Sequence, residues 1–232
     1  MRNMRNRALV CMASVLTLAA FGGCVADLEP APSADRVIGL DGAAKTAVQG
    51  VAVLVQADAW PGPLDIETEV TPLKIRIDNN SADPLQVRYE AFTLVSPTGA
   101  SFAALPLSQI EGEVSELTHT SGARDFYYRD FSVAPYYAPH YPGIDPYPGY
   151  FPLNSYYYDT YYHYWTDIEL PTPAMQQRAL PEGVIDSGGS LDGWLFFERV
   201  DDDLERVVFR ADLVNADTGR KFAEVRIPFT VE

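Results

Sequence analysis

The sequence lacks the positive charge and the catalytic motifs that would point to several common classes of function. It holds 17 Lys and Arg residues against 32 Asp and Glu, a formal net charge of -15, and no basic run follows the first ten residues. Such a chain is poorly suited to neutralise phosphates, so nucleic acid is not expected as a partner. It has no G-x-S-x-G elbow, glycine-rich phosphate loop, H-E-x-x-H pair or calcium loop. We therefore expect a protein that is not an enzyme and needs no cofactor.

Cysteine is also scarce, with only Cys11 and Cys24 in 232 residues. Both lie in a segment that has the pattern of a secretion signal. Three arginines stand within the first seven residues, and a mostly apolar run over residues 8–21 follows them. Fourteen residues are too few for a transmembrane helix, which needs about 20. The N-terminus therefore predicts export rather than a membrane span.

The end of this segment, Phe21-Gly22-Gly23-Cys24, resembles the lipobox of bacterial lipoproteins, although Phe21 stands where an aliphatic residue is usual. The resemblance implies a signal peptide over residues 1–23, fatty acyl chains such as palmitate on Cys24, and anchorage in the cell envelope. Val25 replaces the aspartate of inner-membrane retention signals, which favours the outer membrane. Cleavage also removes Cys11, so no disulfide could form within one chain. The alternative is an ordinary cleaved signal that leaves Cys24 as a free thiol.

Residues 24–45 are rich in Ala, Asp and Pro and lack sustained periodicity, which predicts a linker between the lipid and the fold. Beyond it, apolar and polar residues alternate with a period of two, as in strands with one buried face. A phase slip after Ala91 predicts a bulge or a crossing between sheets. One short helix is expected within 171–180, with Thr172 as its N-cap and Pro173 in its first turn. The expected strands cover 51–56, 73–78, 85–91, 102–104, 191–197, 207–213 and 225–231.

About seven strands with almost no helix predict an all-β domain over residues 46–232, an immunoglobulin-like β-sandwich. The order of the segments 70–73, 79–81 and 183–197, followed by two final strands, resembles accessory immunoglobulin-like modules of bacterial envelope proteins. The resemblance covers residues 46–120 and 180–232. It implies a fold and no activity.

A tyrosine- and proline-rich insertion at about 121–166 interrupts the strand pattern. Thirteen of the 14 tyrosines lie between Tyr127 and Tyr164. Such a segment can be disordered, can fold back on the sandwich as a lid, or can bind a partner, because planar phenols lose little entropy on binding. We expect an interaction module that displays the segment to an envelope protein or a polysaccharide. Its candidate binding surface comprises Tyr136, Tyr137, Tyr141, Tyr147, Tyr150, Tyr156, Tyr157, Tyr158, Tyr161, Tyr162, Tyr164 and Trp165.

Three other groups of residues have a functional interpretation and a simpler structural one. His119, His140 and His163 could bind a metal with nearby aspartates, but their irregular spacing favours solvated loop histidines, so no metal is predicted. The run 201–203 of three aspartates could bind calcium, although a charged hairpin tip explains it more simply. Trp60 and Trp194 could stack on sugars, yet core packing is the simpler role. A purely structural envelope spacer is the remaining alternative to a binding module.

Overall fold

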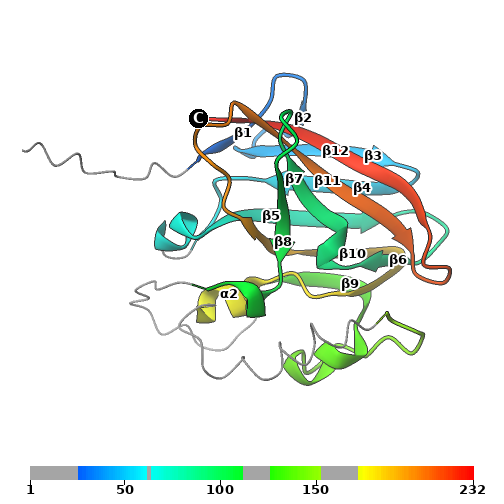
Figure 1. Ribbon diagram of the computed structural model, residues 1–232. Coiled ribbons are helices and arrows are strands. Elements are labelled where there is room, and N and C mark those ends of the chain that lie inside the picture. The colour runs from blue at the N-terminus through cyan, green and yellow to red at the C-terminus, as the bar shows by residue number, and fades with distance from the viewer. Residues whose placement is uncertain (1–25, 62–63, 112–125, 153–171) are drawn as a thin grey trace, which may run out of the picture.

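The computed structural model describes residues 26–61, 64–111, 126–152 and 172–232. In this part of the chain the regular structure is mostly β, with a few short helical turns, and the strands join in one twelve-stranded antiparallel sheet (Figure 1). The strands are β1 (Leu28–Pro30), β2 (Asp35–Arg36), β3 (Ala43–Val48), β4 (Val51–Gln56), β5 (Val70–Asn79), β6 (Leu85–Val87), β7 (Phe92–Val95), β8 (Ser101–Leu105), β9 (Tyr127–Val133), β10 (Gly183–Glu198), β11 (Arg206–Asn215) and β12 (Lys221–Val231).

The sheet folds over so that two runs of strands enclose one core. One run has the order β9-β10-β5-β4-β3-β2, and the other has the order β8-β7-β11-β12-β1. The runs are joined where β8 pairs with β10 and where β6 pairs with both β10 and β11. At the other side β12 contacts β3. Phe197 of β10 and Phe209 of β11 meet across the core, with ring centroids 6.2 Å apart.

The alternating sequence pattern explains most of the strands. In β4 the burial pattern alternates residue by residue, with Val51, Val53 and Val55 buried, as the sequence predicts. The strand β10 is apolar on both faces because it is central, with β5 and β6 along one edge and β8 and β9 along the other. Trp194 is buried against Trp60 in an edge-to-face contact of 5.0 Å. The prediction that both tryptophans are core residues is therefore confirmed.

The phase slip after Ala91 marks the crossing between the two runs. A 3-10 turn, η2 (Tyr89–Ala91), separates β6 from β7, and the chain leaves the edge of β10 for the edge of β11. Asn79 fixes the preceding turn. Its fully buried amide donates to the carbonyl oxygens of Ile185 and Asp83 at 2.9 Å each. The interruption of the strand pattern that the sequence predicts at Ala91 therefore corresponds to this turn.

The helix α2 (Pro173–Arg178) also follows the prediction. The hydroxyl of Thr172 accepts a hydrogen bond from the Met175 amide at 3.3 Å, and the helix ends before Pro181. The remaining helical turns are η1 (Leu64–Thr68), η3 (Leu107–Gln109) and η4 (Pro135–His140). No helix within the described ranges is long and apolar enough to cross a membrane.

The described strands outnumber the seven expected because short and irregular segments also pair. The strand β1 lies in the segment predicted as a linker, pairs with β12, and buries Leu28. The strand β9 lies in the segment predicted as an insertion and pairs with β10. Neither segment has a clear alternation of apolar and polar residues, so these strands can be recognised only from their pairing with β12 and β10. The acidic run 201–203 lies exposed in the β10–β11 connection, as a charged hairpin tip would.

The outer face of the β11–β12 hairpin carries a charge network centred on Glu224. Its carboxylate accepts hydrogen bonds from Arg210, at 2.7 and 3.2 Å, from Lys221, at 2.7 Å, and from Arg226. These hydrogen bonds hold the pKa of the Glu224 carboxyl well below its usual range, and those from Arg210 make the largest contribution. A carboxyl group with a lowered pKa in the folded state stabilises the fold above its unfolded pKa, about 4.3, and loses this effect as the pH falls.

We therefore expect Glu224→Gln to lower the urea midpoint of unfolding at pH 7 and to have a smaller effect at pH 2.5. Urea titrations of both proteins at the two pH values provide the measurement. The exposed Glu205 supplies the control variant, Glu205→Gln. If Glu224→Gln lowered the urea midpoint equally at both pH values, the lowered pKa of Glu224 would not be a source of stability.

Candidate functional site

The described part of the tyrosine-rich segment, residues 126–152, divides its aromatic rings between the core and the surface. Tyr137 and Tyr141 are 1% and 3% exposed, and their ring centroids are 6.1 Å apart. Tyr136 packs edge-on against the buried Phe151 at 5.8 Å. Tyr150, in contrast, is 84% exposed. Some of the predicted surface tyrosines therefore build the segment, and others remain accessible.

Backbone hydrogen bonds fold the segment back on β9. The Val133 amide donates to the Asp145 carbonyl at 3.0 Å, and the Tyr147 amide donates to the Val133 carbonyl at 2.8 Å. The connection between them contains η4, which starts at Pro135, and a turn in which Gly143 has a φ of 94°, a conformation that glycine adopts without strain. This closure brings Tyr147 and the residues after it next to the end of β9.

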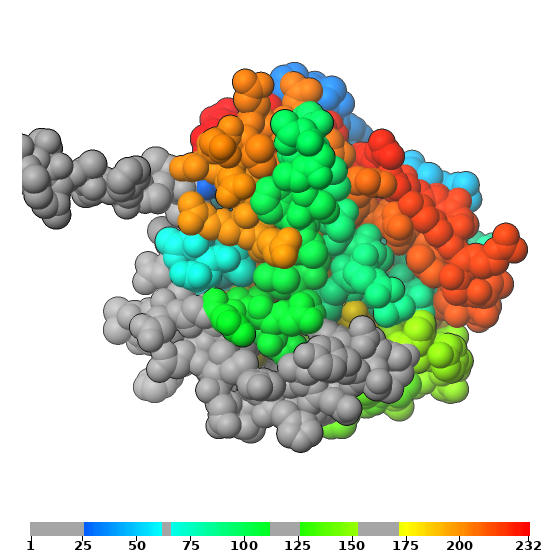
Figure 2. Space-filling model, viewed as in Figure 1, coloured from blue at the N-terminus to red at the C-terminus, as the bar shows by residue number. Residues whose placement is uncertain are grey.

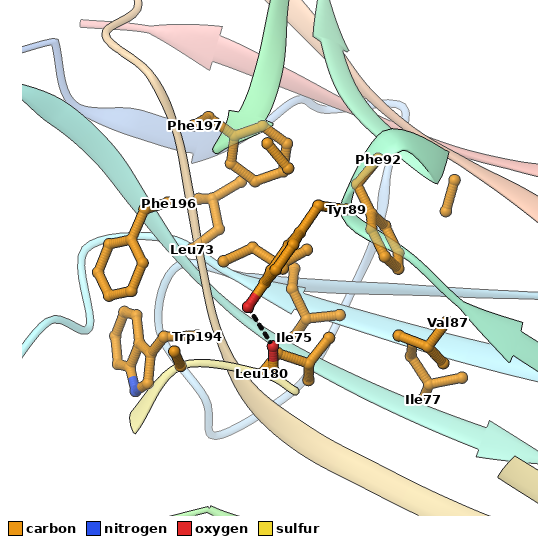
Figure 3. Packing of buried hydrophobic residues seen from close by; sticks show 14 of the residues in the cluster. Leu73, Ile75, Ile77, Val87, Tyr89, Phe92, Leu180, Trp194, Phe196 and Phe197 are labelled. Carbon is orange, nitrogen blue, oxygen red and sulfur yellow. Dashed lines mark hydrogen bonds between the residues drawn. The ribbon is translucent and has the colours of Figure 1, made fainter. Parts of the chain in front are cut away.

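A buried carboxylate, Glu182, attaches the segment to the sheet. Glu182 is 4% exposed, and its carboxylate accepts hydrogen bonds from the Tyr89 amide at 2.8 Å and from the Tyr136 hydroxyl at 3.1 Å. Its backbone carbonyl accepts from the Ala134 amide at 3.0 Å. The Tyr89 hydroxyl donates to the Leu180 carbonyl at 2.7 Å, which Figure 3 shows beside the rings of β10. One residue thus joins η2, η4 and the start of β10.

The exposed part of the segment forms one wall of a groove. The groove has a volume of about 350 Å³ and lies between Tyr147 to Pro152 and the β11–β12 turn. Figure 2 shows the yellow-green surface of the segment beside the red-orange surface of that turn. The residues that line it are Gln86, Tyr147, Gly149, Tyr150, Pro152, Ala216, Asp217, Thr218 and Gly219.

Both walls of the groove are held in place. In the turn, the Asn215 side chain accepts from the amide and the hydroxyl of Thr218 at 2.9 and 3.0 Å, and the Ala216 amide donates to the Pro84 carbonyl at 2.9 Å. On the other wall, the ring of Tyr147 lies over Gly149, where a Cβ would come within 2.6 Å of the ring. A larger residue at this position would displace the ring of Tyr147.

The groove offers flat rings beside groups that form hydrogen bonds. Burial, followed by the charges of Asp217 and Asp186, raises the pKa of Tyr147. A phenol is already neutral near pH 7 at its ordinary pKa of about 10, so the Tyr147 hydroxyl can donate a hydrogen bond. Gln86 is buried at the base, and the exposed Asp217 adds acceptors. Aromatic faces with a few fixed polar groups suit the binding of a neutral polar ligand.

The histidines, Cys24 and the remaining aromatic residues complete the set of residues predicted from the sequence. His140 ends η4 and is partly buried. No group of three His, Cys, Asp or Glu side chains close enough to hold a metal occurs among the described residues. Cys24, His119, His163, Tyr156, Tyr157, Tyr158, Tyr161, Tyr162, Tyr164 and Trp165 lie outside the described residues.

Gln86, Asp217 and Thr218 line the groove but are not among the binding residues predicted from the sequence. The sequence of residues 215–219 is typical of a turn, and Gln86 has the position of a polar residue in an alternating strand. Neither pattern indicates that these residues lie near Tyr150. The pairing of β6 with β11 brings Gln86 next to the turn. The pairing of both β6 and β9 with the start of β10 brings them to the tyrosine-rich segment.

The buried contacts of Glu182 predict a large loss of stability on truncation. Glu182→Ala removes an acceptor of the Tyr89 amide, in a buried hydrogen bond, and an acceptor of the partly buried Tyr136 hydroxyl. A buried donor that loses its acceptor costs about 1–3 kcal/mol. Tyr136→Phe removes one hydrogen bond and should cost about 1 kcal/mol. Urea unfolding of both variants tests this, with Glu205→Ala as an exposed control. A loss for Glu182→Ala no larger than that for Glu205→Ala would show that Glu182 does not anchor the segment.

Comparison with known proteins gives no indication of function. The chain matches no protein-family model, no curated protein and no solved structure. A functional proposal therefore depends on the groove beside Tyr150 and on the hydrogen bonds of Glu182 that hold the tyrosine-rich segment.

Proposed function

We propose that this chain is a non-enzymatic, lipid-anchored protein of the cell envelope, with the outer membrane favoured, and that its tyrosine-rich segment binds a polysaccharide. The observation that carries the proposal is the groove in which Tyr150 is exposed beside Tyr147, Gln86 and Asp217. Its volume of about 350 Å³ falls within the range of small-ligand sites, about 300–1,000 Å³. A protein partner generally needs a larger contact area, about 800 Å² on each side.

An immunoglobulin-like sandwich is the proposed scaffold, and the strand order supports it. In that fold the chain visits strands A, B, C, C′, D, E, F and G in turn, with A-B-E-D in one sheet and C′-C-F-G in the other. Here β4, β5, β7, β8, β9, β10, β11 and β12 follow one another, with β4-β5-β10-β9 in one run and β8-β7-β11-β12 in the other. The additional strands β1 to β3 and β6 depart from the pattern, as do the pairings of β8 with β10 and of β6 with both β10 and β11.

In this scaffold the tyrosine-rich segment belongs to the connection between C′ and E. The equivalent strand D is β9, which comes from the segment itself. The groove then lies between this connection and the F–G turn, at an end of the sandwich. Loops at the ends of such sandwiches commonly carry the binding residues.

The groove predicts that Tyr150→Ala weakens polysaccharide binding three- to tenfold, because loss of one stacking ring costs about 1 kcal/mol. Insoluble peptidoglycan and β-glucan serve as probes in a sedimentation assay with increasing protein concentration. Tyr127→Ala is the matched control, since Tyr127 is also exposed but lies on β9 outside the groove. If neither probe retains the protein, or if both variants bind as the wild type does, the polysaccharide proposal is wrong. A structural spacer would give that result.

The proposed lipid anchor predicts a mature chain that begins at Cys24 and carries acyl chains on that residue. Mass spectrometry of the protein isolated from membranes should show the added mass on the N-terminal peptide. Cys24→Ser should leave the signal peptide attached and remove the acylated form completely. A mature protein with an unmodified Cys24 thiol would support the ordinary secretion signal instead.

A further inference from the structure

The fold begins very close to the proposed lipid anchor. The strand β1 starts at Leu28, four residues after Cys24, and Leu28 is buried and paired with Val231. Four extended residues span at most about 14 Å. Acyl chains on Cys24 would therefore hold this end of the sheet at the membrane surface, without the standoff of a long linker.

The turn over residues 37–42 lies at the same end of the molecule. Arg36 donates a hydrogen bond to the carbonyl of Pro30, the last residue of β1. The Ala57 amide donates to the Gly42 carbonyl at 3.0 Å, and Ala57 lines one pocket together with Ala26. Figure 1 shows β1, β2 and the C-terminus at this end.

This turn exposes apolar side chains that nothing in the described fold covers. Ile38 is 102% exposed and Leu40 is 37% exposed, and they are the only exposed large aliphatic residues among those that the structure describes. The turn is closed by hydrogen bonds from the Val37 amide to the Ala43 carbonyl and from the Leu40 amide to the Val37 carbonyl. The exposed side chains therefore project from a closed turn rather than from an open chain.

We propose that the 37–42 turn inserts Ile38 and Leu40 into the interfacial region of the lipid bilayer to which Cys24 is anchored. This inference rests on the lipid anchor of the proposed function. Apolar side chains that enter a membrane interface strengthen binding in proportion to the apolar area that they remove from water. In the sequence around the turn, Asp27, Asp35 and Asp41 outnumber Arg36 and Lys45. The small excess of negative charge disfavours strongly anionic lipids, so a zwitterionic surface is the expected partner.

A fluorophore attached at residue 38 tests the insertion. In the acylated chain Cys24 has no free thiol and Cys11 has been removed with the signal peptide, so Ile38→Cys supplies a single labelling site. The acylated protein is reconstituted in vesicles of phosphatidylcholine and phosphatidylethanolamine that contain brominated lipid. We expect at least twofold quenching at residue 38.

Ala82→Cys is the matched control, because Ala82 is exposed in the turn that follows β5. The start of β5 lines the pocket that contains Ala26, and ten strand residues separate the two ends by about 30 Å. The label at residue 82 should not be quenched. If the acylated protein floats with the vesicles but residue 38 is not quenched, the insertion is wrong and the anchor stands. If mass spectrometry shows no acyl chains, both the anchor and the insertion are wrong.

Discussion

The hydrogen bonds of one buried carboxylate hold together the parts on which the site depends. Glu182 stands at the start of β10, where η2, η4 and the two runs of strands meet. A buried carboxylate is costly unless donors surround it, and here a backbone amide and a phenol hydroxyl both donate to it. Over residues 126–152, the part of the tyrosine-rich segment that the structure describes, β9 is the one strand, so this contact and the pairing of β9 with β10 fix its position. The groove wall at Tyr147 and Tyr150 follows from that position.

Tyrosine serves two purposes in this segment because its ring is apolar and its hydroxyl is polar. Tyr137 and Tyr141 bury their rings and extend the core beyond the sheet, while Tyr136 uses its hydroxyl on Glu182. Tyr150 remains at the surface, and Gly149 leaves room for the ring of Tyr147 beside it. An exposed aromatic ring on a fixed backbone loses little entropy when it binds. The packed tyrosines thus supply the rigid base that the exposed one requires.

The sequence predicted those elements whose signals are local. The alternation of Val51, Val53 and Val55 marks β4, the phase slip after Ala91 marks the crossing, and Thr172 marks the start of α2. The strands β1 and β9 were not predicted, because they are defined by the edges of β12 and β10 rather than by their own pattern. Glu182 could not be recognised either, since a glutamate between Pro181 and Gly183 resembles a loop residue. The groove combines residues from β6, the tyrosine-rich segment and the β11–β12 turn, and only the tertiary fold brings them together.

The strand directions set the distance between the groove and the proposed anchor. The strand β12 runs from Lys221, next to the groove residue Gly219, to Val231, which pairs with Leu28. Eleven residues of antiparallel strand span about 35 Å. A lipid on Cys24 and a ligand beside Tyr150 would therefore occupy opposite ends of the same strand. Because β12 is hydrogen-bonded to β11 along its length, this separation is rigid. With such an anchor the groove would face away from the bilayer, towards polymers of the envelope, and the 37–42 turn would face the lipid.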